Sequence, residues 1–323
     1  MDLIRECEGA ARIGISAHLK PDGDAVGSCL GLWNYLRTAL PNTQVTVCLQ
    51  NPPVVFRELP GYEEIVSAFP TGAEPFDVYF ALDCNRERLG DVAGAAFDAA
   101  KKKINIDHHI SNPGEGDINE VAPEISSTAE LLFTMMDRKY VNRDTAECIY
   151  VGMIHDSGVF QYSNTSPDTM RRAADLMEYG FEFSRIIRET FYEKTYLQSQ
   201  IMGRCLMESV RFMDGQCIVG LVDRKTMSFY DVTSEDFEGI VNQLLNIKGV
   251  EVALFLYETE AMEFKVSMRS KERVDVSKVA VFFGGGGHVR AAGCTMKGTF
   301  HDCVNNLSER IALQLEASVE SNE

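Results

Sequence analysis

The chain has 323 residues with 45% hydrophobic side chains, enough for two buried cores, and a formal net charge of −17. That charge would repel a long polyanion, which argues against processive binding of long strands and favours a small substrate, although it also serves solubility. No stretch approaches about 18 apolar residues, the N-terminal residues do not resemble a signal peptide, and the nine dispersed cysteines form no C-x-x-C pair, so we expect a cytoplasmic protein with reduced thiols and no membrane span.

The first half of the chain alternates segments typical of strands and of helices. A helix is predicted from Asp24 to Leu40, where Pro41 stops it. Strands are predicted over residues 12–16, 45–49, 78–82 and 104–106. This alternation predicts an α/β fold with a mainly parallel sheet. Because ligands bind at the carboxyl ends of such strands, residues that follow different strands are expected to converge.

The middle is predicted to be helical, and the second half to form a smaller α+β domain. Helices are expected over residues 127–138, 144–155, from Pro167 onward, and over 181–207. Gly215 is expected to turn a hairpin, and strands are predicted over 209–213, 217–222, 252–257 and 264–268. We expect two domains, over residues 1–190 and 200–323.

Histidines and aspartates recur in short, separated clusters. The clusters are His18-x3-Asp22-x-Asp24, Asp83, Asp107-His108-His109 and His155-Asp156, followed by the glycine run that ends in Gly287-His288. Imidazole and carboxylate groups without thiolates suit a divalent ion such as Mn²⁺, and their number exceeds what one ion needs. A two-metal hydrolase is therefore predicted.

Each cluster taken alone also has an ordinary structural explanation. An aspartate in the first cluster could cap the following helix, residues 107–109 could form a solvated loop, and His155 could be favoured by a helix dipole. The glycine run requires positive φ or close backbone approach. It suits amide cradling of a phosphate but could be a flexible loop.

In their order along the chain, these clusters resemble the DHH phosphoesterases, whose signature is Asp107-His108-His109. The second half resembles their DHHA1 subgroup, through residues 266–270 and the run 283–293. The resemblance extends from about Ser16 to Gly293. It implies a catalytic, metal-binding domain over residues 1–190 and a substrate-binding domain over 200–323, with the active site in the cleft between them. The length and the two-domain layout are similar to those of stand-alone oligoribonucleases (nanoRNases) that also act on 3'-phosphoadenosine-5'-phosphate (pAp).

The resemblance implies a ligand set for two divalent ions, with Mn²⁺ preferred. One ion would be held by His18, Asp22 and Asp83. The second would be held by Asp24, Asp83, His108 and Asp156, so that Asp83 bridges. His109 would face the scissile phosphate, and Asp107 would orient the neighbouring imidazoles. His155 receives no firm role from the resemblance.

The resemblance also implies which residues of the second domain hold the rest of the nucleotide. These are Arg269, Ser270, Gly285, Gly286, Gly287 and His288. The expected reaction is hydrolysis of short RNA or DNA oligonucleotides to mononucleotides, of pAp to AMP, or of both. Hydrolysis of pApA or cyclic di-AMP is the main alternative.

Three other functions would account for part of this pattern. A manganese inorganic pyrophosphatase shares the first four clusters but needs a second-domain motif rich in lysine and arginine in place of the glycine run. A RecJ-type exonuclease would need an added strand-binding domain and a more basic surface. An inactive nucleotide-binding regulator would be expected to lack a ligand, yet every position is filled. A homodimer remains an open expectation, because dimers are the commonest assembly.

Overall fold

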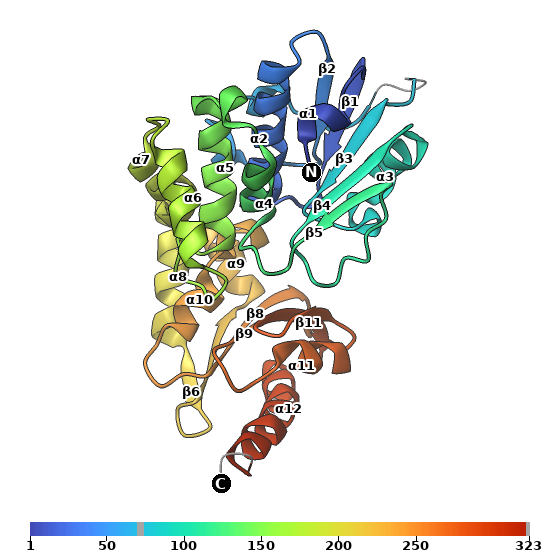
Figure 1. Ribbon diagram of the computed structural model, residues 1–323. Coiled ribbons are helices and arrows are strands. Elements are labelled where there is room, and N and C mark those ends of the chain that lie inside the picture. The colour runs from blue at the N-terminus through green and yellow to red at the C-terminus, as the bar shows by residue number, and fades with distance from the viewer. Residues whose placement is uncertain (70–73, 321–323) are drawn as a thin grey trace. The chain divides into compact units, whose positions relative to one another are not determined.

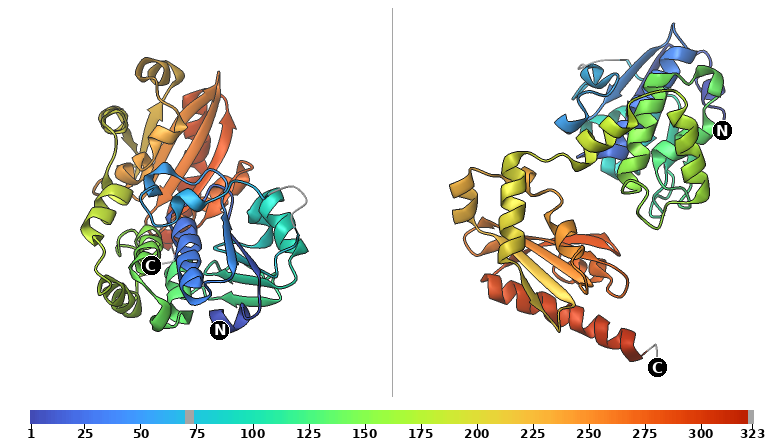
Figure 2. Two further views of the ribbon diagram at one scale, coloured as in Figure 1. Left: turned by 90° about the horizontal axis from the view of Figure 1, so that it is seen from above. Right: turned by 90° about the vertical axis from the view of Figure 1, so that its left-hand side faces the viewer.

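The computed structural model describes residues 1–69 and 74–320, except for the side chains of His288 and of residues 317–320. Contacts divide the chain into two compact units, Met1–Glu193 and Lys194–Glu323. Each unit has its own sheet, and each is described by itself (Figures 1 and 2).

The first unit is built on a five-stranded parallel sheet in the order β2-β1-β3-β4-β5 (Figure 1). The strands are β1 (Arg12–Ser16), β2 (Gln44–Cys48), β3 (Val78–Leu82), β4 (Lys103–Asp107) and β5 (Ile118–Val121). All five residues of β3 are buried, as expected of a central parallel strand. The predicted mainly parallel α/β fold is confirmed. The strand order changes direction between β1 and β3, which is where sheets of this type bind ligands.

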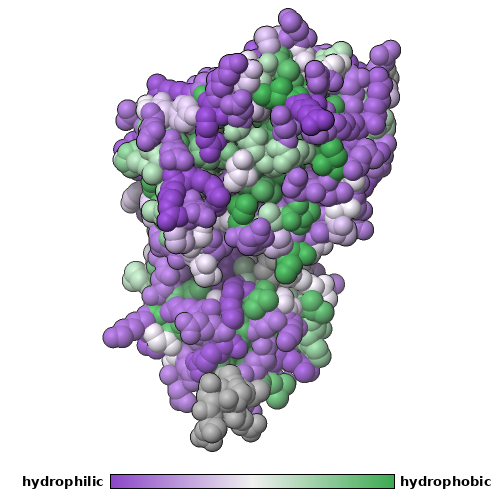
Figure 3. Space-filling view, viewed as in Figure 1, coloured by the Kyte–Doolittle hydropathy of each residue, from purple (hydrophilic) through white to green (hydrophobic). Residues whose placement is uncertain are grey.

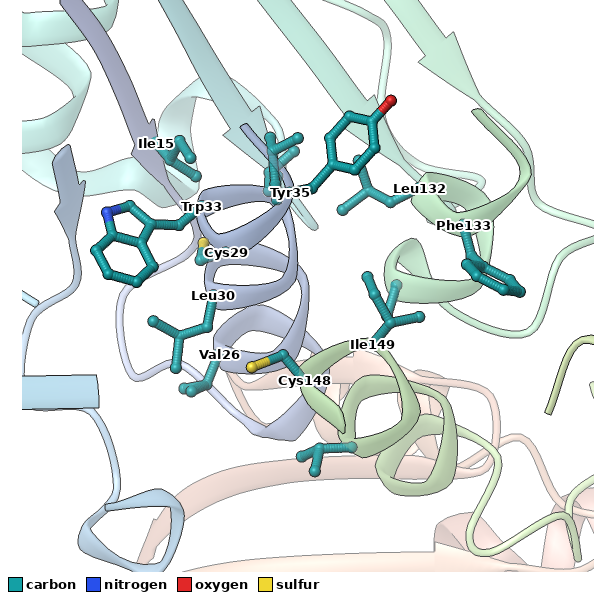
Figure 4. Close-up of a cluster of buried hydrophobic side chains, with 14 of the residues drawn as sticks. Ile15, Val26, Cys29, Leu30, Trp33, Tyr35, Leu132, Phe133, Cys148 and Ile149 are labelled. Atoms are coloured by element: carbon teal, nitrogen blue, oxygen red, sulfur yellow. The ribbon is translucent and has the colours of Figure 1, made fainter. Parts of the chain in front are cut away.

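Helices of the first unit pack against the sheet and supply much of its core. They are α1 (Leu3–Glu6), α2 (Gly23–Ala39), α3 (Gly90–Ala99), α4 (Thr128–Met135), α5 (Arg143–Asp156), α6 (Pro167–Met177) and α7 (Phe183–Ile187). One core joins Ile15 of β1 to Leu30 of α2, Leu132 of α4 and Ile149 of α5 (Figure 4). A separate apolar cluster joins β3 to α3 through Tyr79 and Phe97. Packing of α2, α4 and α5 together brings their ends toward the same edge of the sheet.

Two of the predicted helices are corrected by the structure. The helix predicted over 127–138 ends at Met135. The single helix predicted over 181–207 is wrong in its middle, where α7 passes into a π-helical turn (Arg188–Tyr192) and α8 (Tyr196–Glu208) begins anew. A reciprocal capping box between Thr195 and Gln198 starts α8, because each side chain accepts a hydrogen bond from the other residue's backbone N–H.

The second unit has a six-stranded mixed sheet in the order β10-β11-β9-β8-β7-β6. Its strands are β6 (Val210–Phe212), β7 (Cys217–Val222), β8 (Val252–Glu260), β9 (Glu263–Ser270), β10 (Gly286–His288) and β11 (Ala291–Lys297). The predicted hairpin is confirmed, since β6 and β7 pair antiparallel and Gly215 has a φ of +80°. Only β7 and β8 pair in parallel within this sheet, among the described residues.

Helices cover both faces of this second sheet. They are α8, α9 (Arg224–Tyr230), α10 (Ile240–Leu245), α11 (Val276–Phe282) and α12 (Phe300–Glu320). One face packs on α11 and α12 through residues such as Val266, Val279 and Leu307. The other packs on α8 and α10 through Phe255 and Leu244. In the right-hand view of Figure 2, α12 lies along one side of the sheet and α8 stands on the other.

The face of the molecule seen in Figure 3 is mainly hydrophilic, with apolar side chains scattered between polar ones. Across residues 1–69 and 74–320, no helix has the length and apolar character needed to cross a membrane.

Candidate metal centre

The predicted ligands stand at the ends of secondary-structure elements in the first unit. His18 follows β1, Asp22 caps α2, Asp83 follows β3, His108 follows β4, and Asp156 is the last residue of α5. The fold brings them together in three groups whose ligand atoms lie within 4.8 Å of one another. The groups are His18 with Asp22 and Asp83, Asp24 with His108 and Asp156, and Asp83 with His108 and His109. Residues that are remote in sequence therefore share one site.

Asp83 is the centre of this arrangement. Its Oδ2 lies 3.3 Å from Nε2 of His18, and its Oδ1 lies 3.7 Å from Nε2 of His108. The two oxygens of one buried carboxylate thus face two different imidazoles. Asp83 has a φ of +58°, a left-handed conformation that aspartate tolerates better than most side chains and that is frequent at functional sites. This turn directs the carboxylate into the cluster at the point where β3 ends.

The neighbouring carboxylates are held by backbone groups. Asp24 is almost fully buried, and its two oxygens accept hydrogen bonds from the backbone N–H groups of Thr128, at 2.7 Å, and Ala129, at 2.9 Å. Gly152 of α5 allows this approach, because a Cβ there would lie 2.7 Å from Oδ1 of Asp24. Nε2 of His108 lies 3.3 Å from Oδ2 of Asp156. The buried Asp24 is therefore placed by α4 as much as by its own helix.

The imidazoles are oriented by carbonyl groups. Nδ1 of His18 lies 2.9 Å from the carbonyl oxygen of Leu19, and Nδ1 of His108 lies 3.3 Å from that of Ile125. A ring N–H at Nδ1 that donates to a carbonyl leaves Nε2 as the ligand atom, which is a frequent arrangement for metal-binding histidines. In both residues it is Nε2 that faces the carboxylates.

The charges of the cluster fit divalent cations. Burial and the negative charges of Asp83, Asp156 and Asp22 raise the pKa of Asp24 well above its ordinary value, and burial raises that of Asp156 to about 6. Burial alone would lower the pKa of His18, but the nearby carboxylates of Asp22 and Asp83 raise it to about 10. The cluster therefore holds protons that bound cations would displace.

One buried atom supports the same conclusion. Nε2 of His18 is buried and lies 3.7 Å from Oδ1 of Asp22 and 3.3 Å from Oδ2 of Asp83, with no hydrogen bond of good geometry to any described residue. Buried polar atoms without such a bond are rare, and a bound ion is one recognised explanation. Together with the crowded carboxylates, this atom indicates that the donor set fits divalent metal ions.

Asp107 and His109 form a pair at the edge of the cluster. Oδ1 of Asp107 accepts hydrogen bonds from the backbone N–H of His109 and from its Nδ1. Its Oδ2 accepts from Nδ2 of Asn112, at 2.6 Å. The hydrogen bond with Asp107 raises the pKa of His109. Although burial opposes it, the bonds with His109 and Asn112 keep the pKa of Asp107 below its ordinary value. The imidazole of His109 is thus held in one orientation and favoured as the cation.

His155 lies beside the cluster but outside the three groups of candidate ligands. Its Nε2 lies 3.0 Å from Oγ1 of Thr190 in the π-helical turn. Its ring packs edge-on against Phe56 and Phe191, with centroid distances of 5.0 and 5.5 Å. The structure therefore places His155 in an aromatic contact between α5 and the last turn of the first unit.

The predicted substrate-binding residues lie around β9, β10 and the turn before β10. Arg269 of β9 pairs with Ala291 of β11, and its Nη1 donates to the carbonyl oxygen of Met268 at 3.0 Å. Ser270 is buried, and its hydroxyl donates to the carbonyl oxygen of Val274 at 2.6 Å. The backbone of His288 pairs with Ala291, whereas its side chain lies outside the described part of the chain.

The glycine run shows both features that its composition predicted. Gly287 has a φ of +142°, and a Cβ at Gly285 would lie 2.2 Å from the carbonyl oxygen of Gly293. The run is therefore a tight hairpin with β11, with its last three residues in β10. Only glycine fits these positions without displacing the neighbouring strand.

Several residues that orient the site were missed at the level of sequence. Thr128 donates its hydroxyl to Oδ1 of Asp83 at 3.0 Å, in addition to its backbone bond to Asp24. Asn112 supports Asp107, and Gly152 makes room for Asp24. Ser127-x-x-Glu130 could have marked the start of α4, but no local pattern relates Thr128 to ligands that are more than forty residues away.

Comparisons with known proteins agree with this architecture. Residues 12–153 match the DHH family, N-terminal domain, and residues 215–317 match the DHHA1 domain. The bifunctional oligoribonuclease and PAP phosphatase NrnA of Thermus thermophilus is 33% identical over 304 residues, covering 92% of this chain and 87% of that protein. The protein of the same name from Bacillus subtilis is 27% identical over 301 residues, covering 91% and 92%.

A solved structure gives the same result for the fold. The crystal structure of an exopolyphosphatase-related protein from Bacteroides fragilis superimposes with a TM-score of 0.88 at 29% sequence identity, covering 96% of this chain and 94% of that one. The order of the two domains, the DHH signature and the identity over nearly the whole length all agree. The chain therefore belongs to the DHH family of phosphoesterases and carries a C-terminal DHHA1 domain.

Proposed function

We propose that this phosphoesterase hydrolyses short oligonucleotides to mononucleotides, pAp to AMP, or both, and that Mn²⁺ is its preferred cofactor. The observation that carries the proposal is the Asp83 carboxylate, whose two oxygens face His18 and His108. Relatives named as bifunctional oligoribonuclease and PAP phosphatase support the choice of substrate class. The net charge of −17 favours short substrates over long polyanions.

In this proposal two ions share the cluster. One ion would be held by His18, Asp22 and Asp83, and the other by Asp24, Asp83, His108 and Asp156. The mixed imidazole and carboxylate donors suit Mn²⁺. Two bound ions would supply an activated water and neutralise charge on the phosphoryl group. The chain's own part is to hold these ligands in place through the backbone N–H groups of Thr128 and Ala129 and the carbonyl groups of Leu19 and Ile125.

His109 acts on the substrate in this mechanism. Asp107 contacts Nδ1 of the ring, and we assign Nε2 to the side of the scissile phosphate. Asp107 raises the pKa of His109 and so favours the cationic ring, which can donate a proton toward a phosphoryl or leaving oxygen. Asp107 does not reach the reacting atoms and serves to fix the orientation and charge of His109.

Arg269 and the glycine run contribute to binding of the remainder of the nucleotide. A guanidinium can bind phosphate in a bidentate manner or stack on a base. The backbone amides of Gly285, Gly286 and Gly287 suit close approach to a phosphate because these residues lack side chains. Ser270 and His288 complete the proposed set, with Ser270 supporting the backbone near Val274.

We also propose a reducing, cytoplasmic setting for the protein. All nine cysteines are free and buried, which suits a chain that neither forms nor needs disulfides.

A single comparison of substrates tests the proposed function. The Mn²⁺-loaded protein is incubated with pAp, a three-nucleotide RNA, pApA and cyclic di-AMP, and the products are separated by chromatography. Mononucleotides from the RNA, or phosphate and AMP from pAp, are the expected products. Turnover of cyclic di-AMP or pApA alone would replace the proposal by its main alternative. An Asp83→Ala variant prepared in parallel controls for contaminating phosphatases.

A further inference from the structure

One short segment supports metal-centre residues from three different elements. This segment, residues 125–128, is called the strap below. The carbonyl oxygen of Ile125 lies 3.3 Å from Nδ1 of His108. At its other end, Thr128 donates its backbone N–H to Asp24 at 2.7 Å and its hydroxyl to Asp83 at 3.0 Å. A shift of the strap would therefore disturb three proposed ligands together, namely Asp24, Asp83 and His108.

The middle of the strap is fixed by a buried carboxylate. Glu130 is fully buried, and its Oε2 accepts hydrogen bonds from the backbone N–H of Ser126 at 3.2 Å and from its hydroxyl at 2.6 Å. The same oxygen accepts from the hydroxyl of Thr169 at 2.9 Å, while Oε1 is paired with the guanidinium of Arg172. A buried carboxylate is unfavourable unless its charge and its lone pairs are satisfied, and here both are.

The backbone carbonyl group of Ser126 is also held by a hydrogen bond. Nδ2 of Asn164 donates to the carbonyl oxygen of Ser126 at 3.0 Å and to that of Asp156 at 3.1 Å. Asp156 is itself a proposed ligand at the end of α5. Ser126 is thus held by its N–H, its hydroxyl and its carbonyl, and the last of these bonds connects the strap to a fourth ligand.

We infer that Glu130 is a positioning residue for the metal centre. Its carboxylate, anchored by Arg172 and Thr169, holds Ser126, and the strap in turn holds Asp24, Asp83 and His108 in place. The inference rests on the two-ion centre proposed above. Glu130 lies outside the three groups of candidate ligands. Partners that orient metal ligands typically change metal affinity or activity about 10- to 100-fold when they are removed.

A purely structural role for Glu130 makes a different prediction, and a matched control separates the two. Glu147 of α5 is also a buried glutamate of the first unit, and its carboxylate lies 3.9 Å from the guanidinium of Arg185. Its ion pair involves none of the strap residues. Glu147→Gln and Glu130→Gln each remove one carboxylate charge from a buried glutamate, but only the second change loosens the strap.

The test measures metal binding and folding separately on the full chain. Mn²⁺ affinity is measured by isothermal titration calorimetry, and stability by urea unfolding in EDTA, for wild type, Glu130→Gln and Glu147→Gln. We expect Glu130→Gln to bind Mn²⁺ about 10- to 100-fold more weakly than Glu147→Gln. Its kcat should recover as Mn²⁺ is raised, while its KM for a short oligonucleotide stays close to that of wild type.

Ser126→Ala keeps the inference testable should Glu130→Gln fail to fold, because it removes only the 2.6 Å bond to Glu130. It should weaken Mn²⁺ binding in the same direction. Wild-type Mn²⁺ affinity in a folded Glu130→Gln variant, or in Ser126→Ala where Glu130→Gln does not fold, would overturn the inference. Equal weakening by Glu147→Gln would overturn it too. A wild-type chain that binds no Mn²⁺ would instead overturn the proposed two-ion centre, and the inference with it.

Discussion

Oδ1 of Asp107 accepts two hydrogen bonds from His109, one from its backbone N–H at 3.0 Å and one from Nδ1 of its ring at 2.7 Å. The first bond fixes the turn after β4, and the second fixes the rotation of the imidazole about that turn. Because Oδ2 of Asp107 is bound by Asn112, the carboxylate itself cannot rotate without losing a partner. The DHH signature is therefore a rigid unit in which the first residue sets the direction and charge of the third.

Replacing Asp107 should impair catalysis more than metal binding. In Asp107→Asn the side chain keeps its shape but loses the charge that raises the pKa of His109. We expect kcat to fall about 10- to 100-fold, with two Mn²⁺ still bound per chain by calorimetry. Asn112→Ala, which leaves the bond to His109 intact, should have a smaller effect on kcat. An unchanged kcat in Asp107→Asn would show that His109 does not depend on this carboxylate.

Asp83→Ala should be the most damaging change among the proposed ligands. His18 and His108 lose the carboxylate oxygens that face them, and the separation of the two ions is no longer fixed. We expect activity well below about a tenth of wild type and fewer than two bound ions per chain. Retention of two ions with most of the activity would contradict the bridging role. Asp117→Ala, which removes an exposed carboxylate of the same unit, serves as the control.

Metal removal should abolish activity reversibly. Excess EDTA is expected to remove turnover of every substrate, and replacement of the metal should restore it. Mn²⁺ should restore it better than Mg²⁺, because imidazole donors suit Mn²⁺ while Mg²⁺ prefers oxygen and retains its waters. The measurement is the initial rate on a short oligonucleotide after dialysis against each ion. Full activity in EDTA would be incompatible with the two-ion centre.

The metal-free protein should lose stability as the pH rises from about 5 to about 8. Burial raises the pKa of Asp156 from 3.8 to about 6. The protonated Asp156 carboxyl therefore contributes to stability at low pH, and this contribution is lost as the pH rises through 6. Despite the opposing effect of burial, the nearby carboxylates of Asp22 and Asp83 raise the pKa of His18 from 6.5 to about 10. Its contribution is complete below 6.5 and declines as the pH rises toward 10.

Urea unfolding in EDTA at several pH values measures this dependence. Asp156→Asn should flatten the change near pH 6 and leave the part due to His18. Saturating Mn²⁺ should reverse the trend, because metal ligands bind only after they lose their protons. A metal-free protein that becomes steadily more stable from about pH 5 to 8 would contradict the protonation of this cluster.

The parallel sheet and the ends of its strands could be predicted because their signals are local. The strand at 78–82 is a continuous apolar run, and the predicted bounds are those observed for β3. The positions of Asp83 and His108 after strands followed from the same signal, and parallel topology was enough to predict that they converge. Helical spacing likewise indicated that Asp156 lies at the end of α5.

Other features depend on contacts that no local pattern encodes. The apolar spacing over 181–207 predicted one helix, although Tyr192 and Tyr196 are exposed and a π-helical turn interrupts the segment. The short strand β5 is only partly buried and has a weak apolar pattern. Thr128 and Glu130 act on residues placed beside them by tertiary packing, as in the bond between Thr128 and Asp24. Their roles follow only from the folded structure.

Arg269→Ala should affect substrates according to their length. Arg269 belongs to the second unit, whereas all the proposed metal ligands belong to the first, so the variant should still bind two Mn²⁺. If Arg269 holds the far part of the nucleotide, activity on a short oligonucleotide should fall about 10-fold or more, while a minimal chromogenic phosphodiester is hydrolysed nearly as before. Lys265→Ala removes an exposed cation from the same strand and is the matched control.

Binding energy from a remote group positions the reacting phosphate, so the loss of that group lowers the rate only for substrates that contact it. Equal losses on both substrates would assign Arg269 to the chemistry or the fold, and no loss on either would place the nucleotide pocket elsewhere.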